Sequence, residues 1–322
     1  MKAQDAPEEI SMTALEERIC AYLQLTVQPT QWRVVQSYCT IAPSFVWASP
    51  YIKVFVKLGI NYRLIQYLAN SQLTPSYLAG GIFANTTITV QEYVQAAPLN
   101  YAWKSGDFRS LAGLLKHLQS LQALRRYVSA SYNESYRDLL TRSLRCSKAF
   151  CQHSYIQDMA YRKEIEDLLE QAECSLSHIQ GSGLVPSHGD IHHGNVLVTP
   201  TSMYLVDWET FHLSDPLHDL ADMLWWMCPA TQWEEILTLF QVDLTNPQQR
   251  NRFYFQVLTS ALQKSLWCAH LQQAFLARRY LTDAHLAARQ TPPNEFVPVH
   301  PEFPPANEAR SYENFVRDHF LL

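Results

Sequence analysis

The sequence predicts a two-lobed α+β protein, with a β-rich N-terminal lobe and a mostly helical C-terminal lobe. In the first part of the chain, short runs rich in Val, Ile and aromatic residues are separated by turns, as in YIKVFVK at 51–57. After Pro98 the pattern changes to leucines at helical spacing, as in residues 106–126. We therefore expect one lobe over residues 1–94 and a second over 95–322, with a cleft between them.

The N-terminal lobe is expected to combine short strands with two helices. The first helix is expected at 11–24, where SMTALEERICAYLQ has an amphipathic pattern, and the second at 60–70. Gly80 and Gly81 are expected to interrupt the chain on the approach to the last two strands. The strands themselves are expected at 32–38, 44–48, 51–57, 82–85 and 87–94.

The C-terminal lobe is expected to be helical on both sides of one short hairpin. This hairpin, VLVTPTSMYLVDW, spans 196–208 and has Pro200 near its turn. The helical segments are expected at 106–126, within 133–180, over 216–289, and after a proline-rich loop at 291–305.

The composition is typical of a globular protein and excludes several classes of function. Apolar residues make up 47% of the chain and charged residues 17%, which argues against disorder. The net charge of −5, with no long run of like charges, argues against a nucleic-acid partner. No apolar run approaches the length of a membrane span, and the N-terminal residues lack the apolar core of a signal peptide. We expect a cytoplasmic protein with no membrane partner, and reduced, mostly buried thiols, because the seven cysteines form no CxxC pair or zinc-type spacing.

The stretch SHGDIHHGNVLV, at 187–198, carries the clearest chemical signal. Asp190 is followed five residues later by Asn195, and the hairpin then leads to Asp207 in YLVDWE. Phosphoryl transfer needs a carboxylate near the attacking hydroxyl and oxygen ligands that hold Mg²⁺ against the phosphates. Each of these residues taken singly is typical of an ordinary turn or strand end, so the combined spacing carries the prediction.

The pattern HGDxxxxN, a short hairpin and then DWE resembles the catalytic core of aminoglycoside phosphotransferases and choline kinases. SDPLHDLADML, at 214–224, is similar to the DPxxDLA segment of that family. The resemblance implies a protein-kinase-like fold, ATP and Mg²⁺ as cofactors, a nucleotide-binding N-terminal lobe, and a C-terminal lobe that binds the substrate and carries the catalytic residues. It implies that Asp190 accepts or orients the substrate hydroxyl, that Asn195 and Asp207 ligate Mg²⁺, and that Asp219 braces the catalytic loop. The neighbouring histidines, His192 and His193, are interpreted as loop residues.

The same resemblance assigns nucleotide contacts to the N-terminal lobe. Kinases carry a phosphate-binding lysine on a strand, and Lys57 at the end of VFVK is favoured over Lys53, which has the same strand parity. An exposed lysine at a strand edge is the structural alternative. The segment QEYV resembles the hinge, where the backbone of Glu92 and Val94 would hold the adenine. Apart from the resemblance, the hydroxyls of Thr40 and Ser44 could also contact a phosphate.

Two departures from the family pattern concern this nucleotide site. The loop YCTIAPSF has no glycine, although the family usually has one there, and the first glycine of the chain is Gly59. No Asp or Glu lies between residues 52 and 91, so the helix glutamate that normally pairs with the strand lysine is absent. We expect Lys57 to lack its usual ion-pair partner, the helix glutamate, and ATP affinity to be modest as a result.

The acceptor is expected to be a small molecule with a hydroxyl group, and a cationic acceptor is one option. Three tryptophans, at 225, 226 and 233, could form a cage for a cation, or they could fill the helical core. Asp222 and the Glu234-Glu235 pair could meet an amine, or they could form a solvated helix face. The residue pattern leaves both alternatives open.

The sequence therefore favours an ATP-dependent phosphotransferase that acts on an amino alcohol, an aminoglycoside or a related natural product. The alternative is a pseudokinase-like protein that keeps the fold and binds a ligand or partner without turnover. The missing glycine and glutamate favour this alternative, whereas Asp190, Asn195 and Asp207 favour the enzyme.

Overall fold

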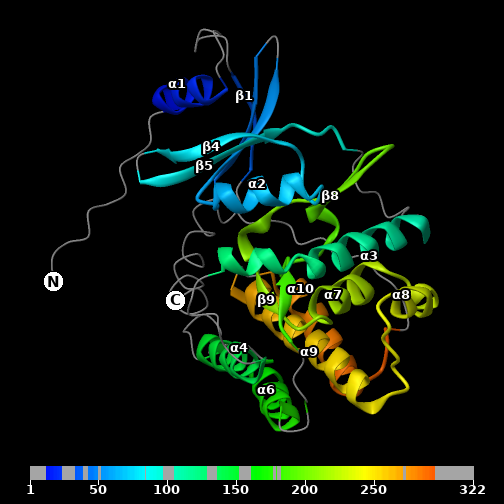
Figure 1. Cartoon of the computed structure of the whole chain (residues 1–322). Helices are drawn as coiled ribbons and strands as arrows, with labels where there is room; N and C mark the ends of the chain where they lie inside the picture. The colour runs from blue at the N-terminus through cyan, green and yellow to red at the C-terminus, as the bar shows by residue number, and fades with distance from the viewer. Residues whose placement is uncertain are drawn as a thin grey trace, which may run out of the picture. The chain divides into compact units, whose positions relative to one another are not determined.

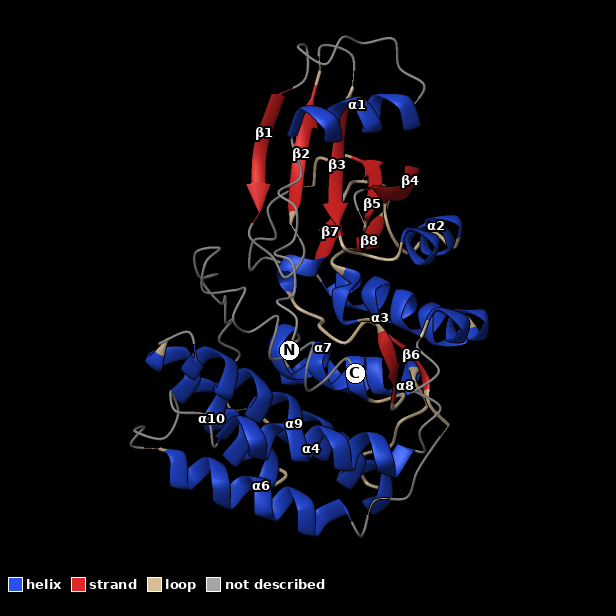
Figure 2. Cartoon of the chain, turned by 90° about the vertical axis from the view of Figure 1, so that its left-hand side faces the viewer, coloured by secondary structure: helices blue, strands red, loops and turns tan. Residues whose placement is uncertain are grey.

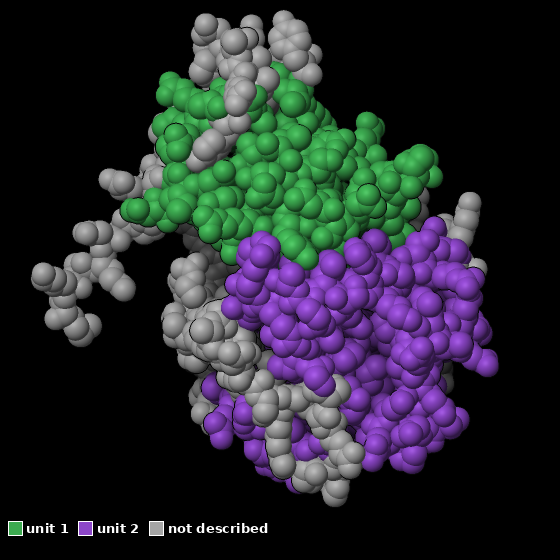
Figure 3. Space-filling model, in the orientation of Figure 1, with its two compact units in different colours: residues 1–97, 197–209 green, residues 98–196, 210–322 purple. Residues whose placement is uncertain are grey.

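The computed structural model describes residues 12–23, 33–38, 43–49, 52–83, 85–96, 105–128, 136–151, 161–176, 179, 183–270 and 273–293. The chain divides into two compact units, which Figure 3 shows in different colours. The N-terminal unit comprises residues 1–97 and 197–209, and the C-terminal unit comprises 98–196 and 210–322. Each unit is described by itself below.

The N-terminal unit is built on an antiparallel sheet of five strands in the order β1-β2-β3-β5-β4 (Figure 1). The strands lie close to the predicted positions, except that β4 begins earlier than expected. Their bounds are β1 (Arg33–Tyr38), β2 (Ser44–Ala48), β3 (Lys53–Leu58), β4 (Tyr77–Phe83) and β5 (Thr86–Glu92).

Strand alternation determines which side chains of β3 enter the core. Val54 and Val56 point into an apolar cluster that also contains Leu15 and Ile19 of α1 (Met12–Tyr22). Figure 2 shows α1 lying over this sheet. Lys57 has the opposite parity to these valines, so its side chain leaves the sheet on the other face. The sheet register thereby keeps the lysine out of the apolar cluster.

Gly80 and Gly81 lie inside β4, so the prediction that they interrupt the chain before a strand at 82–85 is wrong. A Cβ atom built on Gly80 would lie 2.6 Å from the carbonyl oxygen of Ile88 on the neighbouring strand. A β-carbon would therefore clash with the paired backbone, and glycine permits the close approach of the two strands.

A second helix and a hairpin complete the N-terminal unit. Helix α2 (Tyr62–Asn70) begins after Asn61, whose side chain caps it by accepting from the amides of Arg63 and Leu64. The hairpin consists of β7 (Val196–Val198) and β8 (Met203–Leu205).

The hairpin joins the N-terminal unit through its backbone. The amide of Leu205 donates to the carbonyl of Leu73 at 2.8 Å. The unit boundaries therefore differ from the expected division at residue 94, because residues 197–209 pack with the first ninety-seven residues.

The C-terminal unit is helical, as predicted, around the long helix α9. In this unit the strands β6 (Val185–Ser187) and β9 (His212–Ser214) pair antiparallel. Its helices are α3 (Ser105–Ser120), α4 (Tyr136–Cys151), α6 (Arg162–Leu176), α7 (His218–Met227), α8 (Trp233–Leu239), α9 (Pro247–His270) and α10 (Ala274–Ala288).

Helix α9 contacts α10 and α7, and α7 carries Asp219 and Asp222. The predicted helix after the proline-rich loop lies outside the described residues. Within the described part of the chain, no helix combines the length and apolarity that crossing a membrane requires.

The cysteines whose side chains the structure describes are free thiols, as expected. Four of them, Cys20, Cys151, Cys228 and Cys268, are buried, and Cys174 is exposed. Burial raises the pKa of the Cys151, Cys228 and Cys268 thiols to about 12. These three thiols are therefore neutral, packed side chains and not nucleophiles.

Candidate active site

Asp219, in the first turn of α7, accepts hydrogen bonds from the loop that follows β6. The buried carboxylate accepts from the backbone amides of His188 (2.8 Å) and Gly189 (3.0 Å). It also accepts from the hydroxyl of Ser187 at 2.9 Å. Charge-assisted bonds to backbone amides are stronger than neutral ones, so they fix the path of the loop. The family resemblance implied this bracing role, and the structure contains its hydrogen bonds.

Gly189 gives the loop the sharp turn that leads into Asp190. Its φ of +84° lies in the left-handed region, and an added Cβ would sit 2.5 Å from the carbonyl oxygen of Thr210. The hydroxyl of Thr210 in turn donates to the carbonyl of His188 at 2.9 Å. The positive φ and the close approach to Thr210 therefore both favour glycine at position 189, and the hydrogen bond from Thr210 holds the turn in place.

The carboxylate of Asp190 is accessible to solvent, since 38% of its side chain is exposed. The side-chain amide of Asn195 donates to the Asp190 carbonyl at 2.9 Å and to Oδ2 at 3.3 Å. Nε2 of His192 lies 3.4 Å from the same Oδ2. Nδ1 of His192 accepts from the amide of Gly194 at 3.0 Å, so a neutral ring carries its proton on Nε2, facing Asp190.

The surroundings of Asp190 favour its ionised form. Burial alone would raise the pKa of the carboxyl, but the charges of His192, Lys264 and His188 outweigh it, and the pKa falls below its ordinary value. The group is therefore a carboxylate near neutral pH. Asn195 and His192 contact its Oδ2 atom, and neither contacts Oδ1.

Lys264, on α9, contributes a partly buried cation that the sequence did not reveal. Its ammonium lies 2.9 Å from Oδ2 of Asp222, a carboxylate of α7 that is 1% exposed. Burial would lower the pKa of Lys264, but Asp222 and Asp190 outweigh that effect and raise it. No sequence motif marks Lys264, which belongs to an ordinary helical run.

In the N-terminal unit, Lys57 forms ion pairs with both Asp207 and Glu209. Lys57 lacks the usual helix glutamate, as expected, but the chain supplies other carboxylates from the turn after the hairpin, about 150 residues along the sequence. Burial would lower the pKa of Lys57, but the two carboxylates outweigh it and raise the pKa. The sequence did not predict the role of Glu209, because its partner Lys57 lies on a strand far away along the chain.

Asp207 has an unusual backbone conformation for a non-glycine residue. Its φ is +67°, in the left-handed region. Such outliers cost free energy and cluster at functional sites. The turn directs the carboxylate toward Lys57 while 27% of the Asp207 side chain remains exposed.

The other predicted phosphate contacts occupy different positions. Ser44 on β2 lies opposite Lys57 on β3 and is buried, so the two share one face of the sheet. Lys53 is exposed, and its ammonium lies 3.6 Å from the centre of the Tyr93 ring. Lys53 and Lys57 therefore have different surroundings, although they share strand parity.

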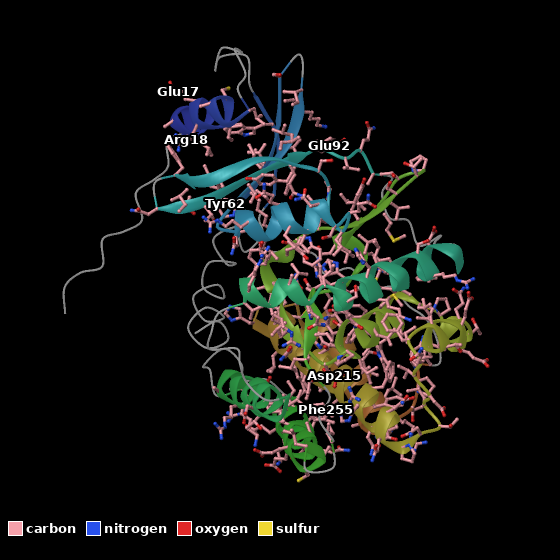
Figure 4. All side chains as sticks on the ribbon, viewed as in Figure 1. Glu17, Arg18, Tyr62, Glu92, Asp215 and Phe255 are labelled. Atoms are coloured by element: carbon pink, nitrogen blue, oxygen red, sulfur yellow. The ribbon has the colours of Figure 1, made fainter. Side chains whose placement is uncertain are left out.

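The predicted hinge lies at the end of β5, where Figure 4 labels Glu92. The amide of Glu92 donates to the carbonyl of Ser76 at 2.9 Å, and its carboxylate accepts from the Ser76 hydroxyl at 2.8 Å. The carbonyl of Val94 accepts from the amide of Ala96 at 3.1 Å. The contacts of the Glu92 and Val94 backbone with adenine stay a prediction.

The chemistry of the proposed metal ligands suits magnesium. The side-chain nitrogen of Asn195 donates to Asp190, so the side-chain oxygen of Asn195 could bind a metal ion. Asp207 has a partly exposed carboxylate. Among the described residues, no three His, Cys, Asp or Glu side chains form a ready metal cage. A Mg²⁺ ion bound with a nucleotide needs only one or two protein carboxylates.

The three tryptophans that could have formed a cage for a ligand cation pack inside the C-terminal unit, and the ring of Trp226 faces the ammonium of Lys264. Trp225, Trp226 and Trp233 are all buried. Trp225 and Trp233 pack with their ring centres 5.9 Å apart, and Phe253 packs against Trp233 at 5.6 Å. Glu235 instead lies on a solvated surface, 55% exposed and paired with Arg109.

Comparison with known proteins identifies the family. The model of the phosphotransferase enzyme family matches residues 61–254, more than half of the chain. The fold is similar to that of a thermostable mutant of aminoglycoside phosphotransferase APH(4)-Ia, at 12% identity and a TM-score of 0.61, over 85% of this chain and 98% of that one. It is similar to spectinomycin phosphotransferase APH(9)-Ia in complex with ADP and spectinomycin, at 16% identity and a TM-score of 0.60, over 88% and 100%.

A third similar structure is LicA in complex with AMP, at 17% identity and a TM-score of 0.59, over 86% of this chain and 96% of that one. At these identities the structural likeness establishes the two-lobed α+β, protein-kinase-like fold that the sequence predicted. The matched family model spans α2, the catalytic loop, the hairpin and α7. On this evidence the chain belongs to the phosphotransferase enzyme family.

Proposed function

We propose that this protein transfers the γ-phosphoryl group of ATP to a hydroxyl group of a small molecule, with Asp190 as the residue that receives the hydroxyl proton. The hydroxyl oxygen bonds to the γ-phosphorus, the bond from that phosphorus to the β-phosphate oxygen breaks, and ADP leaves. One observation carries the proposal: an ionised, partly exposed carboxylate stands on a loop that Asp219 fixes through backbone amides.

The neighbours of Asp190 suit the role of a proton acceptor. Asn195 and His192 both hold Oδ2, which leaves Oδ1 to face a hydroxyl. A held carboxylate needs little reorganisation when the substrate arrives, and positioning is the main source of rate in phosphoryl transfer.

On the nucleotide side, we propose that Lys57 contacts the α- and β-phosphates and that Asn195 and Asp207 ligate Mg²⁺. The metal would neutralise charge on the β- and γ-phosphate oxygens. Glu209 remains as a partner that holds the Lys57 ammonium when Asp207 turns to the metal. Ser44 and Lys53 are proposed as secondary phosphate contacts, and the backbone of Glu92 and Val94 as the adenine contacts.

The nucleotides in two of the similar structures, ADP and AMP, support a nucleotide substrate. The acceptor differs among relatives, so we propose only its class, a small molecule with a hydroxyl group. A protein that binds nucleotide or a partner without turnover is the alternative, and the glycine-free segment YCTIAPSF favours it.

Replacing Asp190 by asparagine tests the proposal. Asp190→Asn keeps the size and hydrogen-bonding shape but removes the proton acceptor, so turnover should fall by roughly 10²- to 10⁴-fold. Transfer to a panel of neutral, acidic and amino alcohols and sugars can be followed by ³¹P NMR and by ADP release. MgATP binding, measured by calorimetry, should stay within about twofold of wild type, a change below about 0.5 kcal/mol.

Thr201→Ala, on the exposed hairpin turn, is the matched control and should keep wild-type turnover. Near-normal turnover by Asp190→Asn would remove Asp190 from its role. Nucleotide binding without any transfer by the wild type would favour the alternative function.

A further inference from the structure

The ion pair of Lys264 with the buried Asp222 lies one helical turn from Asp219, the group that braces the catalytic loop. Asp219 and Asp222 are three residues apart on α7, and residues at this spacing lie on the same helix face. Asp219 binds the backbone of the loop, while Asp222 binds the ammonium of Lys264 at 2.9 Å. The ammonium therefore lies beside the base of the loop that presents Asp190, and its charge acts on that carboxylate.

Trp226 completes the enclosure of this ammonium. The Lys264 nitrogen lies 4.6 Å from the centre of the Trp226 ring, within the range of a cation–π contact. The indole is held in place, because its Nε1 donates to Asp283 at 3.2 Å and Tyr280 packs against it edge to face at 6.0 Å. Asp222 and Trp226 thus form a fixed carboxylate and a fixed aromatic face around one cation.

A carboxylate beside an aromatic face is the arrangement that recognises the ammonium group of a ligand. Here the cation comes from the chain itself, from a side chain that is still 22% exposed. The pair is not optimised for stability, because Oδ1 of Asp222 is buried and has no hydrogen-bond partner among the described residues. A role beyond packing accounts for keeping such a pair next to the catalytic loop.

We infer that Lys264 fills the ammonium site formed by Asp222 and Trp226, and thereby selects an acceptor that is neutral or anionic near the reacting hydroxyl. A cationic acceptor would meet a like charge there and would find the carboxylate and the indole already occupied. The inference rests on the proposed function and specifies its substrate class. It makes Lys264 a specificity-determining residue with no part in the chemical step.

The test removes the internal cation and offers an external one. Lys264→Ala deletes the ammonium and its methylene stem, which together have about the volume of a trimethylammonium group. Choline is the cationic probe, and 3,3-dimethylbutan-1-ol is its neutral counterpart of the same shape. Binding is measured by calorimetry and by thermal shift without nucleotide, so the outcome does not depend on turnover.

The wild type should show no preference for choline over 3,3-dimethylbutan-1-ol. Lys264→Ala should bind choline about tenfold or more tightly than the neutral alcohol, as expected for a cation held by a carboxylate and an indole. The double variant Lys264→Ala/Asp222→Asn should lose that preference. Lys163→Ala removes an exposed lysine of α6 and should behave as the wild type does.

Two results would overturn the inference. One is a folded Lys264→Ala protein with no preference for choline. The other is a wild-type protein that already prefers choline to the neutral alcohol, and this measurement decides the question even if the variant does not fold. Failure of the proposed function shows separately, as a wild type that binds no nucleotide.

Discussion

Each of the two units holds a lysine among carboxylates, but the two lysines are held in different ways. Lys57 pairs with Asp207 and Glu209, two residues apart in a turn, and Asp207 is partly exposed with a left-handed backbone. Lys264, on α9, pairs with Asp222 of α7, a carboxylate that is almost completely buried. The Lys264 ammonium also contacts the indole ring of Trp226.

The difference indicates which site can change on binding. Two carboxylates surround Lys57, so one can leave for a metal ion while the other keeps the ammonium in place. Among the described residues, no second carboxylate hydrogen-bonds Lys264, so removal of Asp222 would leave a partly buried ammonium unpaired. We therefore interpret Lys57 as part of an exchangeable nucleotide site and Lys264 as a fixed charge.

The largest expected difference between the two sites is in stability. Asp222→Ala breaks a buried pair and should lower the free energy of unfolding by about 3–5 kcal/mol. Asp207→Ala should lower it by less than about 1 kcal/mol, because Glu209 still pairs with Lys57 and the repulsion between two carboxylates disappears. Urea unfolding of both variants measures the difference. Equal losses would mean that the two lysines are held alike.

The next effect concerns nucleotide binding by the N-terminal unit. Lys57→Ala should weaken ATP binding by roughly 10- to 100-fold, because charge-assisted hydrogen bonds to phosphate are worth about 1.5–3 kcal/mol. Lys53→Ala should change it by less than about threefold, since exposed charges contribute less than about 1 kcal/mol. Calorimetric titration with MgATP compares the two lysines directly. The reverse order would assign the phosphate contact to Lys53.

The residues around Asp190 could be grouped from the sequence because their signals are local. Asp190, Asn195 and Asp219 stand at fixed offsets, and Gly189 occupies the one position of that loop that needs a left-handed turn. The order of strands and helices followed from patterns of the same short range.

The sequence did not predict the contacts that join distant segments. Lys57 meets Glu209 only after the hairpin has joined the N-terminal sheet, and Lys264 meets Asp222 only when α9 packs on α7. The position of Gly80 within β4 likewise depends on its neighbour β5. No periodicity within one segment carries this information, because each contact is set by tertiary packing.

A smaller effect tests how firmly the catalytic loop is held. Gly189→Ala should cost about 1–2 kcal/mol from its positive φ alone, and contact with the Thr210 carbonyl adds to this cost. Gly183→Ala, in open space nearby, should change stability by less than about 0.5 kcal/mol. Thermal unfolding of both variants provides the comparison. A neutral Gly189→Ala would mean that the loop tolerates another backbone path.

The most direct test of the account is calorimetric titration of the wild type and Asp207→Ala with ATP, each in the presence and absence of Mg²⁺. If Asp207 ligates the metal, Mg²⁺ should strengthen ATP binding to the wild type by about tenfold or more, equal to about 1.4 kcal/mol. Asp207→Ala should lose that gain while it keeps the metal-free affinity, because Glu209 still holds Lys57. Equal ATP affinity of the wild type with and without Mg²⁺ would contradict the account.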